Sequence, residues 1–201
     1  VLPAVLEYQR KLAETVAALE QDAACAAVCS LGRNVDNEGR AVVGHNGTTQ
    51  AGEWRTLGEA LLPPFTFDQL WQVDPIANSS LTMRRDALEQ VGGFPTLMAH
   101  QAEDWLLVLK LSLLAPMPCL DRALMLYTHH AGAYTHAYHA HGWREGARLE
   151  TFYHTAWWML QSPAHADAGA CFFRREYPRQ VADHQRLLPL LRDYYQAGGR
   201  P

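Results

Sequence analysis

The sequence predicts an α/β fold in which a mixed sheet is flanked by helices and followed by a C-terminal helical extension. Strand-like segments alternate with helical patterns through residues 1–135, which is typical of helices packed on a sheet. Residues 136–201 hold helical patterns with no strand pattern between them. Hydrophobic residues make up 48% and charged residues 19% of the chain, as in folded globular proteins. We therefore predict two parts, 1–135 and 136–201.

The first elements are predicted from periodicity. Apolar residues recur every three or four positions over residues 2–19, and Pro3 stands in the first turn, where its missing N–H costs nothing. The segment "CAAVCSLGRNVDNEGRAVV" predicts a strand, a polar turn at Asp36–Gly39 and a second short strand. Residues 45–68 are rich in Gly, Thr and Pro and predict an ordered surface loop.

A strand, a helix and a glycine stop are predicted next. Residues 76–83 read as a strand ending at a basic pair, and Asp86 is placed to cap a short helix. Gly92 and Gly93 then end that helix, because glycine tolerates the left-handed conformation. A helix follows from about Ala102 to Leu114 and is broken by two prolines.

The last elements are a strand and two helices. The segment "CLDRALMLYTHH" predicts the strand, which runs into a histidine-rich stretch. The segments "GARLETFYHTAWWMLQ" and "RQVADHQRLLPLLRDYYQ" predict helices joined by a link near 162–170.

Charge and cysteine content narrow the class of protein. The net charge of −4 gives no reason to expect electrostatic capture of nucleic acid. The four cysteines have irregular spacing, which favours reduced core thiols over a disulfide framework or a zinc site. No apolar run reaches the roughly 20 residues of a membrane span, and no signal peptide is visible. We expect a cytoplasmic protein, either free or peripheral at the membrane.

Three segments carry a resemblance to a known family. They are "SSLTMRRDALEQVGGF", the pair Glu103–Asp104 opening an apolar helix, and "LYTHH" at a strand end. In this order and spacing they resemble the second half of a family 2 glycosyltransferase with the GT-A fold. The opening "VLPAVLE" and the turn "NVDNEG" are similar to the family too. The resemblance covers roughly residues 1–135, so the fold expected there is a partial GT-A domain.

The resemblance implies an inverting transfer of a sugar from a nucleotide-sugar donor to an acceptor hydroxyl, on a sugar or a glycolipid. Asp104 would be the general base, and Glu103 and Trp105 would bind substrate. We expect the helix N-terminus to lower the pKa of Asp104 and keep its carboxylate ionised. The alternative is that both acids are the ordinary charged first turn of a helix.

Two further residues are candidates by the same resemblance. His130 would contact the donor diphosphate or its metal ion, although Thr128 stands where the family usually has arginine. An exposed histidine at a strand end is the equal alternative. Arg84 would face the cleft and bind substrate, or else form a surface ion pair.

The histidine-rich stretch 129–141 and the aromatic residues of the tail have simpler interpretations. Three of the histidines, His136, His139 and His141, lie close in sequence, but no cysteine or carboxylate stands among them, which disfavours a dedicated zinc site. Trp157–Trp158, together with Phe152 and Tyr153, form aromatic positions at helical spacing that predict core packing, with sugar stacking as the alternative.

The Asp-x-Asp motif that holds Mg²⁺ or Mn²⁺ in the family occurs nowhere in the chain. We therefore expect the cation to belong to a complete enzyme, the donor-binding half to be missing, and the chain alone to have little or no activity. Exposed sheet edges and apolar surface would then favour self-association. Cell-surface polysaccharide or glycoconjugate synthesis is the expected setting. The alternative function is a non-catalytic module that binds a carbohydrate or a protein.

Overall fold

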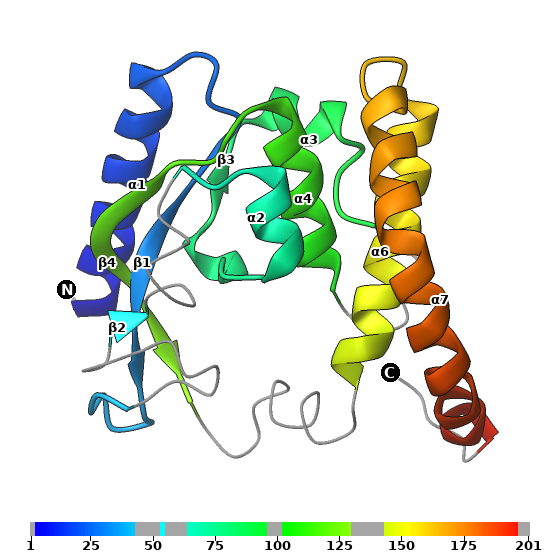
Figure 1. Ribbon diagram of the computed structural model, residues 1–201. Coiled ribbons are helices and arrows are strands. Elements are labelled where there is room, and N and C mark those ends of the chain that lie inside the picture. Colours follow the sequence, from blue (N-terminus) through cyan, green and yellow to red (C-terminus); the bar gives the residue numbers. More distant parts are fainter. Residues whose placement is uncertain (1–2, 43–52, 55–63, 96–101, 130–142, 197–201) are drawn as a thin grey trace. The chain divides into compact units, whose positions relative to one another are not determined.

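The computed structural model describes residues 3–42, 53–54, 64–95, 102–129 and 143–196 (Figure 1). Contacts divide the chain into two units, one of Val1–Gly93 with Leu107–Ala133 and one of Phe94–Leu106 with Tyr134–Pro201. The predicted boundary at residue 135 lies outside the described residues. In chain order the elements are α1 (Pro3–Gln21), β1 (Ala27–Val35), β2 (Glu53–Trp54), α2 (Phe67–Gln72), the 3₁₀ turn η1 (Asn78–Ser80), β3 (Thr82–Met83), α3 (Arg85–Gln90), α4 (Glu103–Leu114), β4 (Cys119–Thr128), α6 (Trp143–Gln161) and α7 (Ala166–Gln196).

The sheet of the first unit is built around β1. This strand pairs in parallel with β4 and antiparallel with β2 and β3, so the sheet is mixed. Gly32 and Arg33 pair with β2 and with β4, which places these two strands on opposite edges of β1. In Figure 1, α1 covers one side of β1 and β4, and α2, α3 and α4 are drawn on the other. The predicted α/β class with a mixed, helix-flanked sheet is confirmed.

The polar turn after β1 forms as predicted. Asp36 Oδ1 accepts hydrogen bonds from the backbone N–H groups of Glu38 and Arg40, each at 2.9 Å. Gly39 adopts φ 77°, a conformation that glycine reaches without steric cost. Within the described residues after the turn, an isolated bridge joins Val35 to Ala41, and the end of the predicted second strand lies outside the described residues. The predicted loop 45–68 contains the two-residue strand β2, and most of that loop lies outside the described residues.

The region around the basic pair differs from the prediction in two ways. The strand expected over 76–83 is only Thr82–Met83, because the preceding residues form η1, in which the Ser80 hydroxyl donates to Ala77 O at 2.7 Å. Asp86 is not the cap of α3, since Arg84 occupies that position and Asp86 lies in the first turn. The glycine stop is confirmed: Gly92 and Gly93 have φ 79° and 71°.

Helix α4 is the most deeply buried element. It starts and ends within a residue of the predicted bounds, and every residue from 105 to 112 is buried. A helix that is apolar on all sides is buried on all sides. Lys110 and Ser112 are the polar exceptions in this buried run: the Lys110 ammonium donates to Val91 O at 3.1 Å, and the Ser112 hydroxyl donates to Leu109 O at 2.7 Å. Burial lowers the pKa of Lys110.

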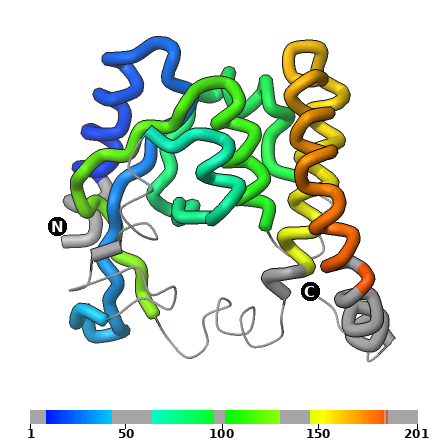
Figure 2. Tube along the Cα trace, in the orientation of Figure 1, coloured from blue at the N-terminus to red at the C-terminus, as the bar shows by residue number. Residues whose placement is uncertain are grey.

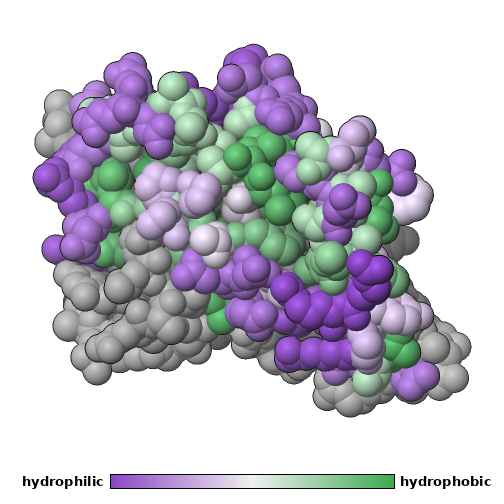
Figure 3. Space-filling model, turned by 45° about the horizontal axis from the view of Figure 1, so that its top comes forward, coloured by the Kyte–Doolittle hydropathy of each residue, from purple (hydrophilic) through white to green (hydrophobic). Residues whose placement is uncertain are grey.

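Helix α1 buries a face that matches its apolar spacing only in part. Thr15 and Leu19 are buried, and Leu19 packs with Cys25, just before β1, and with Val28 in β1. Leu12 and Val16 are exposed instead. On the face drawn in Figure 3, hydrophilic residues cover much of the described surface and hydrophobic ones emerge in separate patches. Exposed apolar surface therefore exists, while self-association stays a prediction.

The second unit contains the helical hairpin of α6 and α7 (Figure 2). The link between them is shorter than predicted, because α7 begins at Ala166. Phe152 is fully buried and its ring stacks on Phe173, with centroids 5.5 Å apart. Core packing is thus confirmed for Phe152, whereas Trp157 is 66% exposed. Among the described helices, none is long and apolar enough to cross a membrane.

Candidate active site

Asp104 lies in the first turn of α4 and is half-buried. Its Oδ1 accepts a hydrogen bond from the N–H of Trp105 at 2.8 Å. Burial is the largest influence and raises the pKa of Asp104 above its ordinary value, the Trp105 N–H opposes this, and the neighbouring Glu103 carboxylate raises the pKa further. The N–H of Trp105 at the helix start does lower the pKa of Asp104, as expected, but burial outweighs it and the net shift is upward. A carboxylate with a raised pKa is a stronger base once it is ionised.

Neither acid occupies the capping position of α4. The backbone hydrogen bonds of the helix begin with Leu106 N–H donating to Ala102 O at 2.9 Å, so Ala102 stands at the cap. A capping carboxylate accepts from N–H groups two or three residues ahead, whereas Asp104 accepts from its immediate neighbour. Glu103, also half-buried, stands in the same first turn. Both acids stand near the free N–H groups of the first helical turn, which favours negative charge there. Asp104 nevertheless does not make the hydrogen bond of a capping residue.

Trp105 is buried next to this pair, at 8% exposure. The guanidinium carbon of Arg148, from α6, lies 5.7 Å from the centre of the Trp105 ring. Both residues belong to the second unit. The cation–π contact holds the Arg148 guanidinium against Trp105, which directly follows Asp104. Sequence reasoning missed Arg148, because nothing local to α6 marks it as a partner of α4. A role for Trp105 in binding substrate stays a prediction.

Arg84 is placed by the first unit and contacts main-chain carbonyls. Its Nε donates to Cys25 O at 2.9 Å, and its Nη2 donates to Leu19 O and more weakly, at 3.4 Å, to Asp22 O. Leu19 and Asp22 stand at the C-terminal end of α1, whose last carbonyls lack helical partners. In this structure Arg84 therefore closes the end of α1, and none of the described ion pairs involves it.

The end of β4 carries a histidine contact, though at a different residue from the predicted one. His129 Nε2 lies 2.8 Å from Oδ1 of the buried Asn34, and the His129 and Tyr127 rings are 5.0 Å apart. His130, predicted for the diphosphate or a metal, lies outside the described residues, as does the rest of the histidine-rich stretch.

The described residues do not form a divalent-cation site by themselves. Within these parts of the chain, no three His, Cys, Asp or Glu side chains come together as a metal ion would need. Mg²⁺ or Mn²⁺ therefore remains an expectation that rests on the resemblance alone.

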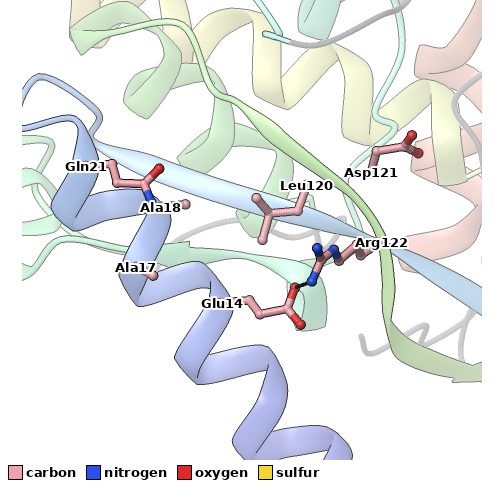
Figure 4. Close-up of a pocket in the computed structure, with 7 residues that line it drawn as sticks. All are labelled: Glu14, Ala17, Ala18, Gln21, Leu120, Asp121 and Arg122. Carbon is pink, nitrogen blue, oxygen red and sulfur yellow. Dashed lines mark hydrogen bonds and ion pairs between the residues drawn. The ribbon is translucent and has the colours of Figure 1, made fainter.

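A pocket of about 330 Å³ lies between α1 and β4 (Figure 4). Glu14 forms ion pairs with Arg122 at 3.0 Å and with Arg10 at 2.8 Å, while Asp121 points away from them in the figure. The hydrogen bond from Arg10 and then the charge of Arg122 hold the pKa of Glu14 below its ordinary value. Because its opposite charges are already paired, this pocket is a weaker candidate than the surroundings of Asp104.

Comparison with known proteins adds no family to this geometry. No protein-family model matches the sequence, and no curated protein matches it significantly.

Proposed function

We propose that the chain is the acceptor-side part of an inverting glycosyltransferase of family 2, which moves a sugar from a nucleotide-sugar donor to an acceptor hydroxyl. The observation that carries the proposal is Asp104, a half-buried carboxylate at a helix start whose pKa is raised by burial. Perturbed acids in partly buried positions are enriched at catalytic sites. The resemblance of "SSLTMRRDALEQVGGF", Glu103–Asp104 and "LYTHH" to the family, with its GT-A fold, supplies the reaction class.

The mixed sheet supports the same proposal. A parallel pair, β1 with β4, and an antiparallel pair, β1 with β3, are compatible with the mixed sheet that the GT-A resemblance implies. Of the two other segments that carry the resemblance, one includes β3 and the other includes the end of β4.

In the proposed step the Asp104 carboxylate removes the proton of an acceptor hydroxyl while that oxygen attacks the anomeric carbon. The nucleotide leaves from the opposite face of the sugar, so the configuration inverts. Burial makes the carboxylate a better base, because its protonated form is favoured where water solvates the charge poorly. Glu103 is close enough to raise that pKa. In the proposal its carboxylate positions the acceptor.

The test is sugar transfer from common nucleotide-sugar donors in the presence of Mn²⁺, with the 201-residue chain and with any longer natural form of it. Asp104→Asn should lower kcat by about 10²–10⁴-fold, the usual contribution of a general base, while donor binding persists. Glu103→Gln is the matched control, since it neutralises the adjacent acid and should leave more activity. Transfer that is unchanged in Asp104→Asn would refute the role of Asp104.

One observation favours the second function, a non-catalytic carbohydrate- or protein-binding module. Tyr153, Trp157 and Leu160 are all exposed and stand at helical spacing on α6, and Trp157 is the most exposed large hydrophobic residue among those described. Exposed aromatic residues recur where proteins bind partners or sugar rings. If no donor turns over and Trp157→Ala abolishes binding to an immobilised glycan mixture, this function replaces the first.

A further inference from the structure

Two of the four cysteines meet across the β1–β4 pair. Cys29 and Cys119 are register partners at the first paired position of these parallel strands. Neighbouring strands lie about 4.8 Å apart, which is within the range of about 4.4–6.8 Å between the Cα atoms of bridged cysteines. All four cysteines are free thiols in this structure.

The two side chains also point to the same side of the sheet. Val28 and Leu120, which adjoin Cys29 and Cys119 in sequence, pack together with Leu19 on the α1 side. Because side chains alternate along a strand, both cysteines point to the opposite side. The Cys29 thiol donates to Pro118 O at 3.7 Å, and the Cys119 thiol donates to Leu120 O at 3.7 Å. The Cys29 sulfur therefore lies beside the start of β4, next to its register partner.

The two thiols differ in exposure and in acidity. Cys29 is 2% exposed, whereas Cys119 is half-buried. The neighbouring Cys29 thiol lowers the pKa of Cys119, while the interaction with Cys119 together with burial raises the pKa of Cys29. Cys119 is therefore the thiol that ionises first, and its neighbour keeps its proton.

We propose that Cys29 and Cys119 form a redox-active pair, which a hydroperoxide converts into a reversible disulfide between β1 and β4. The Cys119 thiolate attacks the peroxide oxygen and becomes a sulfenic acid, while the second oxygen leaves as water or an alcohol. The Cys29 sulfur then attacks the Cys119 sulfur, which forms the S–S bond and releases the sulfenic oxygen as water. Two thiols are oxidised and one hydroperoxide is reduced.

This inference is independent of the proposed transferase, because it uses neither Asp104 nor a sugar donor. It adds a covalent modification site to the strand whose far end carries Tyr127 and His129. A disulfide there would tie the start of β4 to the central strand of the sheet.

The experiment exposes the folded chain to hydrogen peroxide and maps the products by intact mass and non-reducing peptide mass spectrometry. We expect the loss of two hydrogen atoms, a peptide linking Cys29 to Cys119, and full reversal by dithiothreitol. The rate should rise with pH as the Cys119 thiol ionises. Cys171→Ser, which removes an exposed cysteine outside the pair, should behave as the wild type.

Two variants separate the roles. In Cys119→Ser the Cys29 thiol should remain reduced, and in Cys29→Ala the Cys119 sulfur should proceed to sulfinic acid, because its resolving partner is absent. The proposal is overturned if wild-type Cys119 reaches sulfinic acid while Cys29 stays a thiol. It is equally overturned if Cys119 does not react, or if Cys171 links two chains while the pair stays reduced.

Discussion

Replacing Arg84 with alanine tests whether this residue is structural. The side chain donates to Cys25 O at 2.9 Å and to Leu19 O, with a weaker contact to Asp22 O at 3.4 Å. A hydrogen bond to a charged group contributes about 1.5–3 kcal/mol when buried, and a cation at a helix C-terminus adds about 0.3–1 kcal/mol. Because Arg84 is half-buried, water replaces part of this. We expect Arg84→Ala to lower the free energy of unfolding by about 2–3 kcal/mol.

Urea denaturation followed by circular dichroism measures this loss, and Arg85→Ala is the matched control. Arg85 adjoins Arg84, carries the same charge and is exposed. Its replacement should change the free energy of unfolding by no more than about 0.5 kcal/mol, as usual for surface substitutions. Equal stabilities for the two variants would refute the closure of α1 by Arg84. Arg84→Lys should recover only part of the loss, because an ammonium cannot reach carbonyls spread as a guanidinium fork can.

Three further predictions concern packing and pH. Gly169→Ala would place a Cβ 2.7 Å from Met159 Cβ, so overpacking of about 1–3 kcal/mol should outweigh the gain of about 1 kcal/mol in helix propensity and lower the thermal midpoint. Because the pKa of Asp104 is raised, the folded state keeps the Asp104 proton up to a higher pH than the unfolded state does. The free energy of unfolding should therefore fall as pH rises from the unfolded-state pKa to the folded-state pKa. Urea titrations at a series of acidic pH values should show this fall in the wild type and not in Asp104→Asn. The lowered pKa of Lys110 has the opposite consequence: stability should rise with pH between the folded and the unfolded pKa at alkaline pH, and Lys110→Met should abolish the rise.

The elements that sequence predicted best are those whose signal is local. The Asp36–Gly39 turn and the Gly92–Gly93 stop follow from side-chain hydrogen bonding and from positive φ, which depend on a few adjacent residues. Helix α4 was predicted because its apolar run is long and is ended by prolines. Such signals need no knowledge of the rest of the fold.

The elements that sequence missed depend on partners distant in the chain. The apolar spacing of α1 predicts Leu12 and Val16 inside, yet the helix buries Thr15, whose hydroxyl meets Thr82 Oγ1 at 3.0 Å. The strand expected before Arg84 yields to a 3₁₀ turn that local serine hydrogen bonds stabilise. In both places, contacts with residues distant in the chain or local side-chain hydrogen bonds outweigh the pattern of apolar residues.

The candidate site divides in the same way. Glu103 and Asp104 could be found by their position at a helix start, but the sign of the pKa shift of Asp104 depends on how much protein surrounds the carboxylate. Arg148 over Trp105 and the register of Cys29 with Cys119 join residues far apart in sequence, so no local motif announces them.

The burial of Asp104 also separates the two interpretations of the acid pair without any substrate. An acid that merely opens a helix stabilises it, because the free N–H groups and the helix dipole favour the ionised form and lower its pKa. Asp104 has the opposite shift, so its ionised form costs stability at neutral pH. If Asp104→Asn stabilises the chain near pH 7, the wild-type acid is retained at a cost, as is common for functional residues. If the variant is less stable at every pH, Asp104 serves the helix and the general-base proposal loses its main support.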